Sequence, residues 1–130
     1  RAIEVEDLTK HKMDSEQMEI NEQNANLINK TKEKENKVCI VGTTTMKAVE
    51  TAAITGNRVK VYSGWSNKFI FPHYNFDIAD AMITNFHPPL SSMLMMVSAF
   101  GGYDLIMEAY KHAVEKEYKF LTYGDAMLII

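Results

Sequence analysis

The chain has 130 residues, enough for one domain, and 46% of them are hydrophobic, as a packed core requires. Its 14 Lys and Arg residues against 17 Asp and Glu residues give a net charge of −3, which argues against a protein that holds nucleic acid mainly through a broad basic face. The sequence contains no run of 18 apolar residues, no secretory leader pattern and only one cysteine, so we expect a cytoplasmic protein without a membrane partner or an internal disulfide.

The first third of the chain predicts a strand, a polar loop and a surface helix. Residues 2–6 alternate apolar and acidic side chains, which favours a half-exposed strand, and the absence of a methionine before Arg1 suggests a piece of a longer protein. After a polar loop over residues 11–16, Asn21 is expected to cap a helix that ends near residue 36. The apolar seam of that helix is predicted to be Ile20, Leu27, Ile28 and Thr31.

A buried strand, a turn and a second helix are predicted next. Residues 38–41 form a mostly β-branched apolar run closed by Gly42, which is typical of a strand buried on both faces, and Cys39 within it is expected to be a buried thiol. Helix-period apolar residues over 46–53 follow. A second pair of strands is expected over residues 60–62 and 68–71, with a loop between them.

The last third predicts a strand, two helices and a final strand. Residues 81–84 form a buried strand, and Ser91 is expected to cap an apolar helix over residues 93–100. An apolar stripe over residues 105–113 indicates another helix, and residues 126–130 a closing strand. Strands that alternate with helices favour an α/β fold with a largely parallel, barrel-like sheet and helices packed outside it.

The turn that begins the second predicted helix is a candidate anion site. Gly42, Thr43 and Thr44 place backbone N–H groups and hydroxyls at a helix N-terminus, which favours a phosphate or carboxylate, and Lys47 could add charge. The alternatives are a threonine that only caps the helix and a lysine that is solvated.

A second candidate segment directly follows the strand predicted over residues 81–84. Asn85, Phe86 and His87 supply an amide, a ring and an imidazole that can move a proton near neutral pH, although a loop histidine is often structural. Trp65 could stack a purine base or pack in the core, and Asp125 could pair with a cation or cap a turn. The four scattered histidines and single cysteine predict no metal site.

Several motifs in this order resemble one enzyme family. They lie at residues 11–16, 42–44, 64–72, 84–89, 97–100 and 118–129. Together they are similar to the S-adenosylmethionine:tRNA ribosyltransferase-isomerases of queuosine biosynthesis, and the resemblance covers nearly the whole chain.

The resemblance implies a larger, two-domain enzyme of which residues 1–130, as a single domain, are the C-terminal part. Such an enzyme transfers and isomerises the ribosyl group of S-adenosylmethionine onto 7-aminomethyl-7-deazaguanine at the wobble position of tRNA. The product is epoxyqueuosine, and adenine and methionine are released. S-adenosylmethionine is then a substrate, tRNA is the partner, no prosthetic group is expected, and the protein is expected to be a monomer.

Loop position and residue chemistry give a hypothesis for which residues meet the needs of this reaction. The expected catalytic groups are His87 for proton transfer and Asp125 as an orienting carboxylate. The expected substrate-binding residues are Gly42, Thr43, Thr44, Lys47, Trp65, Asn85 and Phe86. Lys47 stands where the family usually has arginine, and Leu90 where it usually has a basic residue. A diverged paralogue that binds tRNA or a nucleoside without this ribosyl transfer therefore remains an alternative.

Overall fold

The structure is a computed structural model that describes residues 2–130. Helices and strands alternate along the chain, and none of the helices within these residues is long and apolar enough to cross a membrane. The elements are η1 (Leu8–Lys10), β1 (Glu16–Ile20), α1 (Glu22–Glu33), β2 (Cys39–Val41), α2 (Thr43–Thr51), β3 (Ala53–Ile54), β4 (Arg58–Val59), β5 (Tyr62–Ser66), β6 (Ala81–Asn85), α3 (Ser92–Gly101), α4 (Tyr103–Glu115) and β7 (Ala126–Ile129).

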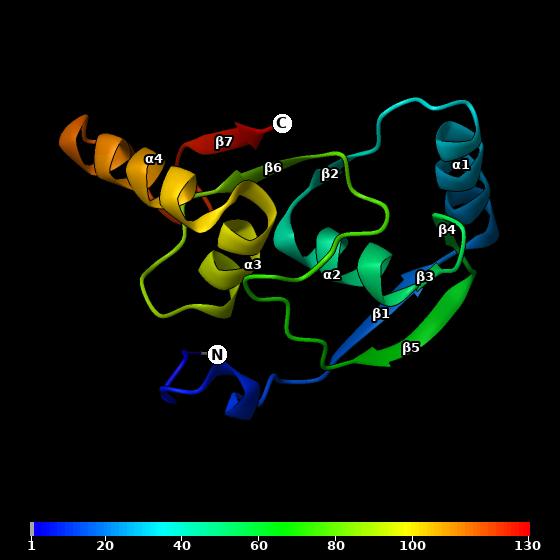
Figure 1. The fold of residues 1–130 in the computed structure, drawn as a ribbon, viewed down its shortest axis with the longest axis horizontal. Helices are drawn as coiled ribbons and strands as arrows, with labels where there is room; N and C mark the ends of the chain where they lie inside the picture. Colours follow the sequence, from blue (N-terminus) through cyan, green and yellow to red (C-terminus); the bar gives the residue numbers. More distant parts are fainter. Residues whose placement is uncertain (1) are drawn as a thin grey trace.

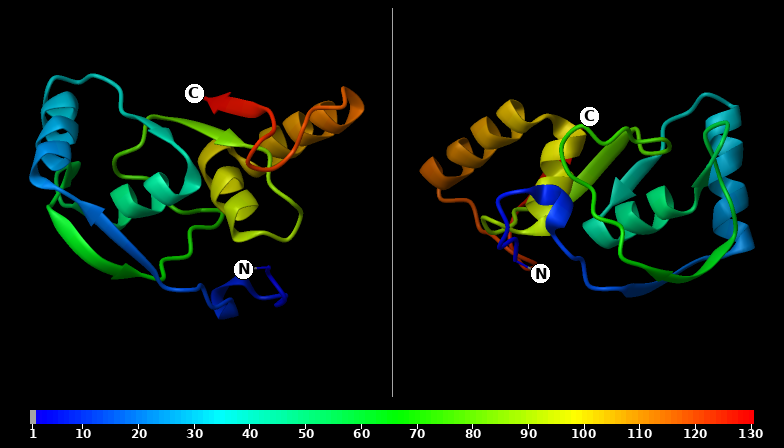
Figure 2. Two further views of the ribbon diagram at one scale, coloured as in Figure 1. Left: turned by 180° about the vertical axis from the view of Figure 1, so that it is seen from behind. Right: turned by 60° about the horizontal axis from the view of Figure 1, so that its bottom comes forward.

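Two groups of strands enclose helix α2. The larger sheet has the order β2-β6-β7, in which β2 is parallel and β7 antiparallel to β6. The strands β1 and β5 form an antiparallel ribbon, and β3 pairs with β4 in a short hairpin. Figure 1 shows α2 between the three-stranded sheet and the ribbon, with α1 at one end of the molecule and α4 at the other, and both views in Figure 2 show the same layout.

The α/β class is confirmed, but the expectation of a largely parallel sheet is wrong. Of the four strand pairs in residues 2–130, only β2 with β6 is parallel. Two helices rather than one connect β6 to β7, so the chain reverses once more and returns antiparallel. The three small sheets show no barrel closure within this part of the chain.

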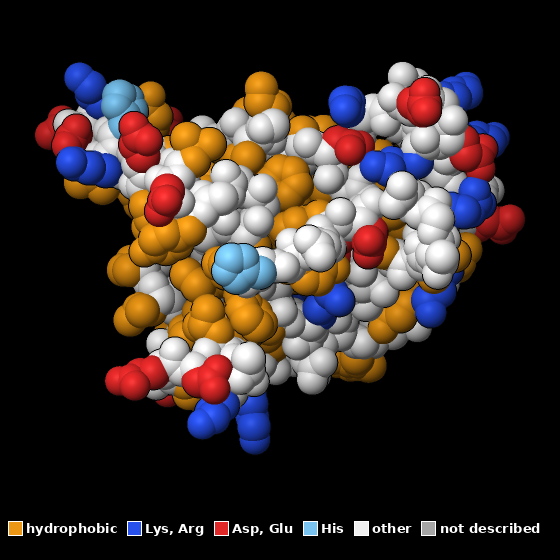
Figure 3. Space-filling view, in the orientation of Figure 1, with side chains coloured by type: hydrophobic (Ala, Val, Ile, Leu, Met, Phe, Trp, Pro, Cys, Tyr) orange, Lys and Arg blue, Asp and Glu red, His pale blue; other side chains and the backbone are white. Residues whose placement is uncertain are grey.

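The hydrophobic core surrounds α2 and the central strand β6. Met46 of α2 and Ala52 at its C-cap are fully buried, as the helical spacing predicted, and so are Met82 of β6 and Val97 of α3. Figure 3 shows hydrophobic side chains in the middle of one face, whereas charged side chains gather over α1, over α4 and over the N-terminal segment at the bottom of the view. The residues at the junction of α2, β6 and α3 are therefore held by packing on several sides.

Both predicted N-caps are confirmed. The Asn21 side chain accepts a hydrogen bond from the backbone N–H of Asn24 (2.8 Å), and the Ser91 hydroxyl accepts one from Leu94 (3.1 Å). Each bond satisfies a backbone donor that the first turn of a helix leaves without a partner. The helices α1 and α3 therefore begin where the sequence placed them.

The strands of the N-terminal half differ from the prediction. Residues 2–6 form no strand beyond an isolated bridge from Ala2 to Ser91, and β1 lies instead at the end of the predicted polar loop. The partner of β1 is β5, which occupies most of the predicted loop over residues 63–67. Residues 68–71 form no strand. Ile70 is buried, but the segment around it is irregular and does not pair with a neighbouring strand. The pairing of β1 with β5 joins segments far apart in the sequence, and residue type alone does not specify it.

The buried-thiol expectation for Cys39 is also wrong. In β2 only Ile40 points into the core, whereas Cys39 and Val41 are exposed. The strand is at the edge of its sheet, and the described residues cover one of its faces.

The predicted apolar seam of α1 also differs from the structure. In α1 the buried residues are Ala25 and Asn29, and Leu27 of the predicted seam is exposed.

A buried carboxylate on α2 fixes the long segment between β5 and β6. Glu50 accepts hydrogen bonds from the backbone N–H groups of Asp77 (2.8 Å) and Ile78 (3.0 Å) and from the hydroxyl of Tyr74 (3.2 Å). Burial, together with the charge of Glu50, raises the pKa of the Tyr74 hydroxyl. This carboxylate therefore anchors a segment that lacks regular structure.

Replacing Glu50 by glutamine in the full-length protein is expected to lower the free energy of unfolding by about 1–3 kcal/mol, because an amide oxygen is a weaker acceptor and the NH₂ group has no buried acceptor here. Urea unfolding measures the change. The matched variant Tyr74→Phe removes one of the three hydrogen bonds and should cost less. Equal losses in the two variants would contradict the anchoring role.

Candidate functional site

Three loops converge on one cavity of about 420 Å³. Because β2 and β6 are parallel, the loops after them start at the same edge of the sheet, and antiparallel β7 begins at that edge too. The candidate segments that the sequence indicated at residues 42–44 and 85–87 therefore meet at one cavity, and the turn that holds Asp125 lies beside it. Its lining residues are Val41, Gly42, Thr43, Thr44, Thr45, Ile83, Thr84, Asn85, His87, Pro88, Met93, Leu121, Thr122 and Ala126.

The start of α2 forms one wall of this cavity. Gly42 adopts φ +91°, a conformation that suits glycine, and its N–H donates to the carbonyl of Ile83 (2.8 Å). No side chain caps the helix, so the alternative in which a threonine caps it is wrong. The backbone N–H groups of Thr43 and Thr44 have no acceptor within the helix, and both residues line the cavity. This wall can bind an anionic or carbonyl oxygen.

His87 lies on the same cavity in a fixed position. It is 9% exposed, and its Nε2 lies 2.8 Å from the hydroxyl of Thr84. Its backbone N–H donates to the Tyr110 hydroxyl (2.8 Å), so the loop is tied to α4. Burial lowers the pKa of the His87 imidazole, and the ring is therefore neutral at neutral pH. A neutral, positioned imidazole can accept a proton.

A hydrogen bond between Asn85 and Asp125 connects the end of β6 to the start of β7. Asn85 lines the cavity, and its Nδ2 donates to the backbone carbonyl of Asp125 (3.1 Å). The Asp125 carboxylate accepts from the backbone N–H of Lys119 (2.7 Å), while the N–H of Asp125 donates to the carbonyl of Lys119 (2.8 Å). The Asp125 side chain thus closes the turn before β7 and does not line the cavity.

The two aromatic candidates lie away from the cavity. Phe86 is 3% exposed and packs against Tyr110 and Phe120, with ring centroids 5.2 Å away in both cases. Trp65 is 65% exposed on β5, opposite Gln17 of β1. Phe86 therefore supports the loop from behind, whereas the Trp65 ring is free to meet solvent or a partner.

Lys47 is buried, so the alternative of a solvated lysine is wrong. It is 3% exposed and lies 3.7 Å from a carboxylate oxygen of Glu16 in β1. Together with Thr43 and Thr44, it lines a smaller pocket of about 120 Å³ next to the cavity. The structure thus places Gly42, Thr43, Thr44, Asn85 and His87 around one cavity and Lys47 directly behind its α2 wall.

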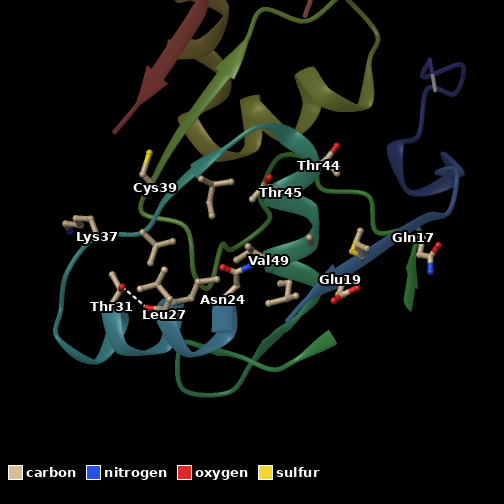
Figure 4. Close-up of a pocket in the computed structure, with 16 residues that line it drawn as sticks. Gln17, Glu19, Asn24, Leu27, Thr31, Lys37, Cys39, Thr44, Thr45 and Val49 are labelled. Carbon is tan, nitrogen blue, oxygen red and sulfur yellow. Dashed lines mark hydrogen bonds between the residues drawn. The ribbon is translucent and has the colours of Figure 1, made fainter. Parts of the chain in front are cut away.

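A larger groove of about 560 Å³ lies on the other side of the α2 N-terminus. Figure 4 shows Leu27 of α1 and Val49 of α2 beside this groove, with Lys37 and Cys39 on the β2 side. The Thr31 hydroxyl at its edge already donates to the carbonyl of Leu27 (2.8 Å). None of the described histidines lines this groove, so the cavity around His87, which gathers the proton-transfer and anion-binding groups, is the better candidate site.

Two residues that support His87 were not among the sequence candidates. Thr84 holds the imidazole, and its position three residues earlier, at the end of β6, was the available signal. Tyr110 was read only as part of the apolar stripe of its helix, and nothing in the sequence pointed to its hydroxyl. Among residues 2–130, no group of three or more His, Cys, Asp or Glu side chains could hold a metal ion.

Comparison with known proteins gives a consistent family. A family model described as queuosine biosynthesis protein matches residues 1–129. Proteins named S-adenosylmethionine:tRNA ribosyltransferase-isomerase from Phocaeicola vulgatus and Parabacteroides distasonis are 56% and 57% identical over all 130 residues. The chain spans about 37% of the length of these relatives.

A solved structure supports the same assignment. The crystal structure of S-adenosylmethionine tRNA ribosyltransferase from Thermotoga maritima matches with a TM-score of 0.81 at 41% identity, over 86% of this chain and 39% of that chain. The fold and the sequence therefore agree. The chain belongs to the queuosine biosynthesis protein family, as its resemblance to the S-adenosylmethionine:tRNA ribosyltransferase-isomerases predicted.

Proposed function

We propose that the full-length protein carrying this chain transfers and isomerises the ribosyl group of S-adenosylmethionine onto 7-aminomethyl-7-deazaguanine at the wobble position of tRNA, giving epoxyqueuosine. The names of the relatives support this reaction. The observation that carries it is the single cavity in which a neutral, buried imidazole lies beside an uncapped helix N-terminus. Such a site combines a base with a binding wall for anionic or carbonyl oxygens.

In this proposal each residue around the cavity has a defined part. His87 takes the proton beside the sulfonium, and Thr84 holds the ring in position. Gly42, Thr43 and Thr44 bind an oxygen of the substrate, and Asn85 is a further contact. Loss of adenine, attack by the amine of the deazaguanine and closure of the epoxide with expulsion of methionine complete the reaction.

The other predicted residues act from a distance. Asp125 orients the loop before β7 through its bond to Lys119, and Phe86 packs behind His87. The exposed ring of Trp65 offers a stacking surface for a base of the tRNA.

The proposal concerns the whole enzyme. We infer that this chain is the C-terminal part of the larger of two domains and that the remaining protein completes both the barrel-like sheet and the site. The share of about 37% of the relatives' length supports a larger parent protein. We propose that the enzyme works in the cytoplasm, where its tRNA substrate is found, and that it is a monomer.

A diverged paralogue is the second candidate. The observation that favours it is the loss of one cationic group: Leu90, in the turn before α3, is 67% exposed where a basic residue is usual. Such a protein would bind tRNA or a nucleoside through the same cavity without ribosyl transfer.

One experiment separates the two candidates. The full-length protein is incubated with S-adenosylmethionine and tRNA that carries the 7-aminomethyl base, and adenine and epoxyqueuosine are measured by mass spectrometry. Release of adenine together with epoxyqueuosine is the expected result. Binding of the tRNA without either product would support the paralogue and reject the proposed reaction.

The pH dependence of adenine release should reflect the buried imidazole. Because burial lowers the pKa of His87 below its ordinary value of 6.5, the neutral base persists into mildly acidic solution. The pH at which the rate falls to half should therefore lie below 6.5. A pH–rate profile under saturating substrates measures this. A rate already halved well above that pH would contradict the assignment.

The same shift has a consequence for stability. On unfolding below the ordinary pKa of 6.5, the imidazole takes up a proton that the folded protein resists. The contribution of His87 to stability is therefore present above this pH and is lost as the pH falls toward the lowered pKa of the folded state.

A further inference from the structure

A small pocket of about 120 Å³ lies between the N-termini of two helices. Thr43 and Thr44 from the first turn of α2 form one side, and Ser92 and Met93 from the first turn of α3 form another. The Ser91 cap satisfies only the N–H of Leu94, so the N–H groups of Ser92 and Met93 have no acceptor within the helix. Both helix dipoles thus favour negative charge at this pocket.

An unsatisfied cation lines the same pocket. Lys47 is 3% exposed, and its Nζ has no hydrogen-bond partner within residues 2–130. The carboxylate of Glu16, at 3.7 Å, is too distant for a hydrogen bond and is half-exposed. Lys68 also lines the pocket, although its Nζ lies over the ring of Tyr74, 5.1 Å from the ring centre. Burying an ammonium group without hydrogen bonds is costly, so Lys47 points to an anionic ligand group.

The acidic neighbour of Lys47 narrows the choice of ligand. Glu16 lines the pocket as well, and its carboxylate would repel a phosphate dianion that lay against Lys47. A ligand with an ammonium group next to a carboxylate satisfies both side chains. The pocket holds the volume of about four water molecules, which suits this small head group and excludes a nucleoside. Its apolar walls, from Met13, Ile70 and Met96, suit an alkyl chain.

We propose that this pocket binds the α-ammonium and carboxylate groups of an amino-acid ligand. The ligand is taken to be the methionine end of S-adenosylmethionine, and in this the inference rests on the proposed function. Lys47 and the first-turn N–H groups of α2 and α3 bind the carboxylate, and Glu16 binds the ammonium group. Because the pocket and the cavity share Thr43 and Thr44, the ligand extends past this turn with its sulfonium toward His87.

Equilibrium binding to the full-length protein tests the pocket. Isothermal titration calorimetry compares S-adenosylmethionine with decarboxylated S-adenosylmethionine, and L-methionine with 3-(methylthio)propylamine, which lacks the carboxylate. The wild-type protein should prefer the carboxylate-bearing member of each pair by about 10- to 100-fold, as expected for a buried charged hydrogen bond. Equal affinities within both pairs, or no binding of any of the four compounds, would overturn the proposal.

The variant Lys47→Met should reduce this preference to about threefold or less by weakening only the carboxylate-bearing ligands. The matched control is Lys60→Met, because Lys60 is an exposed lysine outside the pocket and its loss should leave the preference unchanged. If Lys47→Met fails to fold, Glu16→Gln replaces it: loss of this half-exposed carboxylate should weaken the binding of all four compounds, since each carries an ammonium group, and unchanged affinities would reject the pocket. A Lys47→Met protein with the full preference would reject the pocket.

Adenine release keeps the two proposals apart. A protein that releases adenine but shows no preference for the carboxylate retains the proposed function and loses this pocket. A protein that releases no adenine but binds L-methionine in a Lys47-dependent way retains the pocket and loses the proposed reaction.

Discussion

Replacing His87 by asparagine in the full-length protein is expected to lower the rate of adenine release by about 10²- to 10⁴-fold, the range that a positioned general base contributes. Asparagine is polar and smaller than histidine, so it removes the proton acceptor with limited change to the loop. The backbone N–H that donates to Tyr110 remains available. Single-turnover measurements with saturating S-adenosylmethionine and tRNA determine the loss in the chemical step.

Two neighbouring variants show whether the imidazole itself carries the effect. Thr84→Val removes the hydroxyl that lies 2.8 Å from Nε2 of His87 and should cost less, because the positioning contact is lost but the imidazole that accepts the proton is still present. Tyr110→Phe removes only the hydroxyl that accepts from the backbone of His87. A His87→Asn protein with wild-type turnover would reject the catalytic assignment.

Replacing Gly124 by alanine should have the largest effect on stability. A Cβ at this position would overlap the carbonyl oxygen of Lys119 and lie 2.7 Å from that of Phe120, and both atoms belong to the backbone. The turn cannot yield without breaking the two hydrogen bonds between Lys119 and Asp125. We expect a loss of about 3 kcal/mol in the free energy of unfolding, at the upper end of the range for overpacking.

Thermal unfolding of the full-length protein, with hydrogen exchange over residues 119–126, measures this change. The matched control is Gly64→Ala in β5, where the nearest atom is the Tyr62 hydroxyl at 3.4 Å and the added methyl group is accommodated. Because Leu121 and Thr122 line the cavity, Gly124→Ala should also lower activity. Equal stability of the two variants would show that the turn is more adaptable than its packing indicates.

Local interactions explain most of what the sequence predicted correctly. The caps at Asn21 and Ser91 join residues only three positions apart, so the start of each helix is encoded within one turn. The strands β2 and β6 are short apolar runs that bury Ile40 and Met82 whichever strand they pair with. The shared edge of these parallel strands then brought the predicted turns to one cavity.

Long-range contacts explain what the sequence did not predict. The register of β1 with β5 joins Glu16 to Ser66, and local composition contains no record of that pairing. Lys47 has the same origin: its nearest charged partner, Glu16, is far away in the sequence, and nothing in a helix of mixed composition marks one lysine as buried. For Phe86, the sequence showed an aromatic ring but not the neighbours that surround it.

The first turn of α2 separates the cavity around His87 from the pocket around Lys47, since Thr43 and Thr44 line both. If S-adenosylmethionine spans this turn as proposed, adenine is released in the cavity and methionine in the pocket. Neither product then blocks the departure of the other. Product release would then follow a random order, with adenine and methionine each able to rebind while the other is still present.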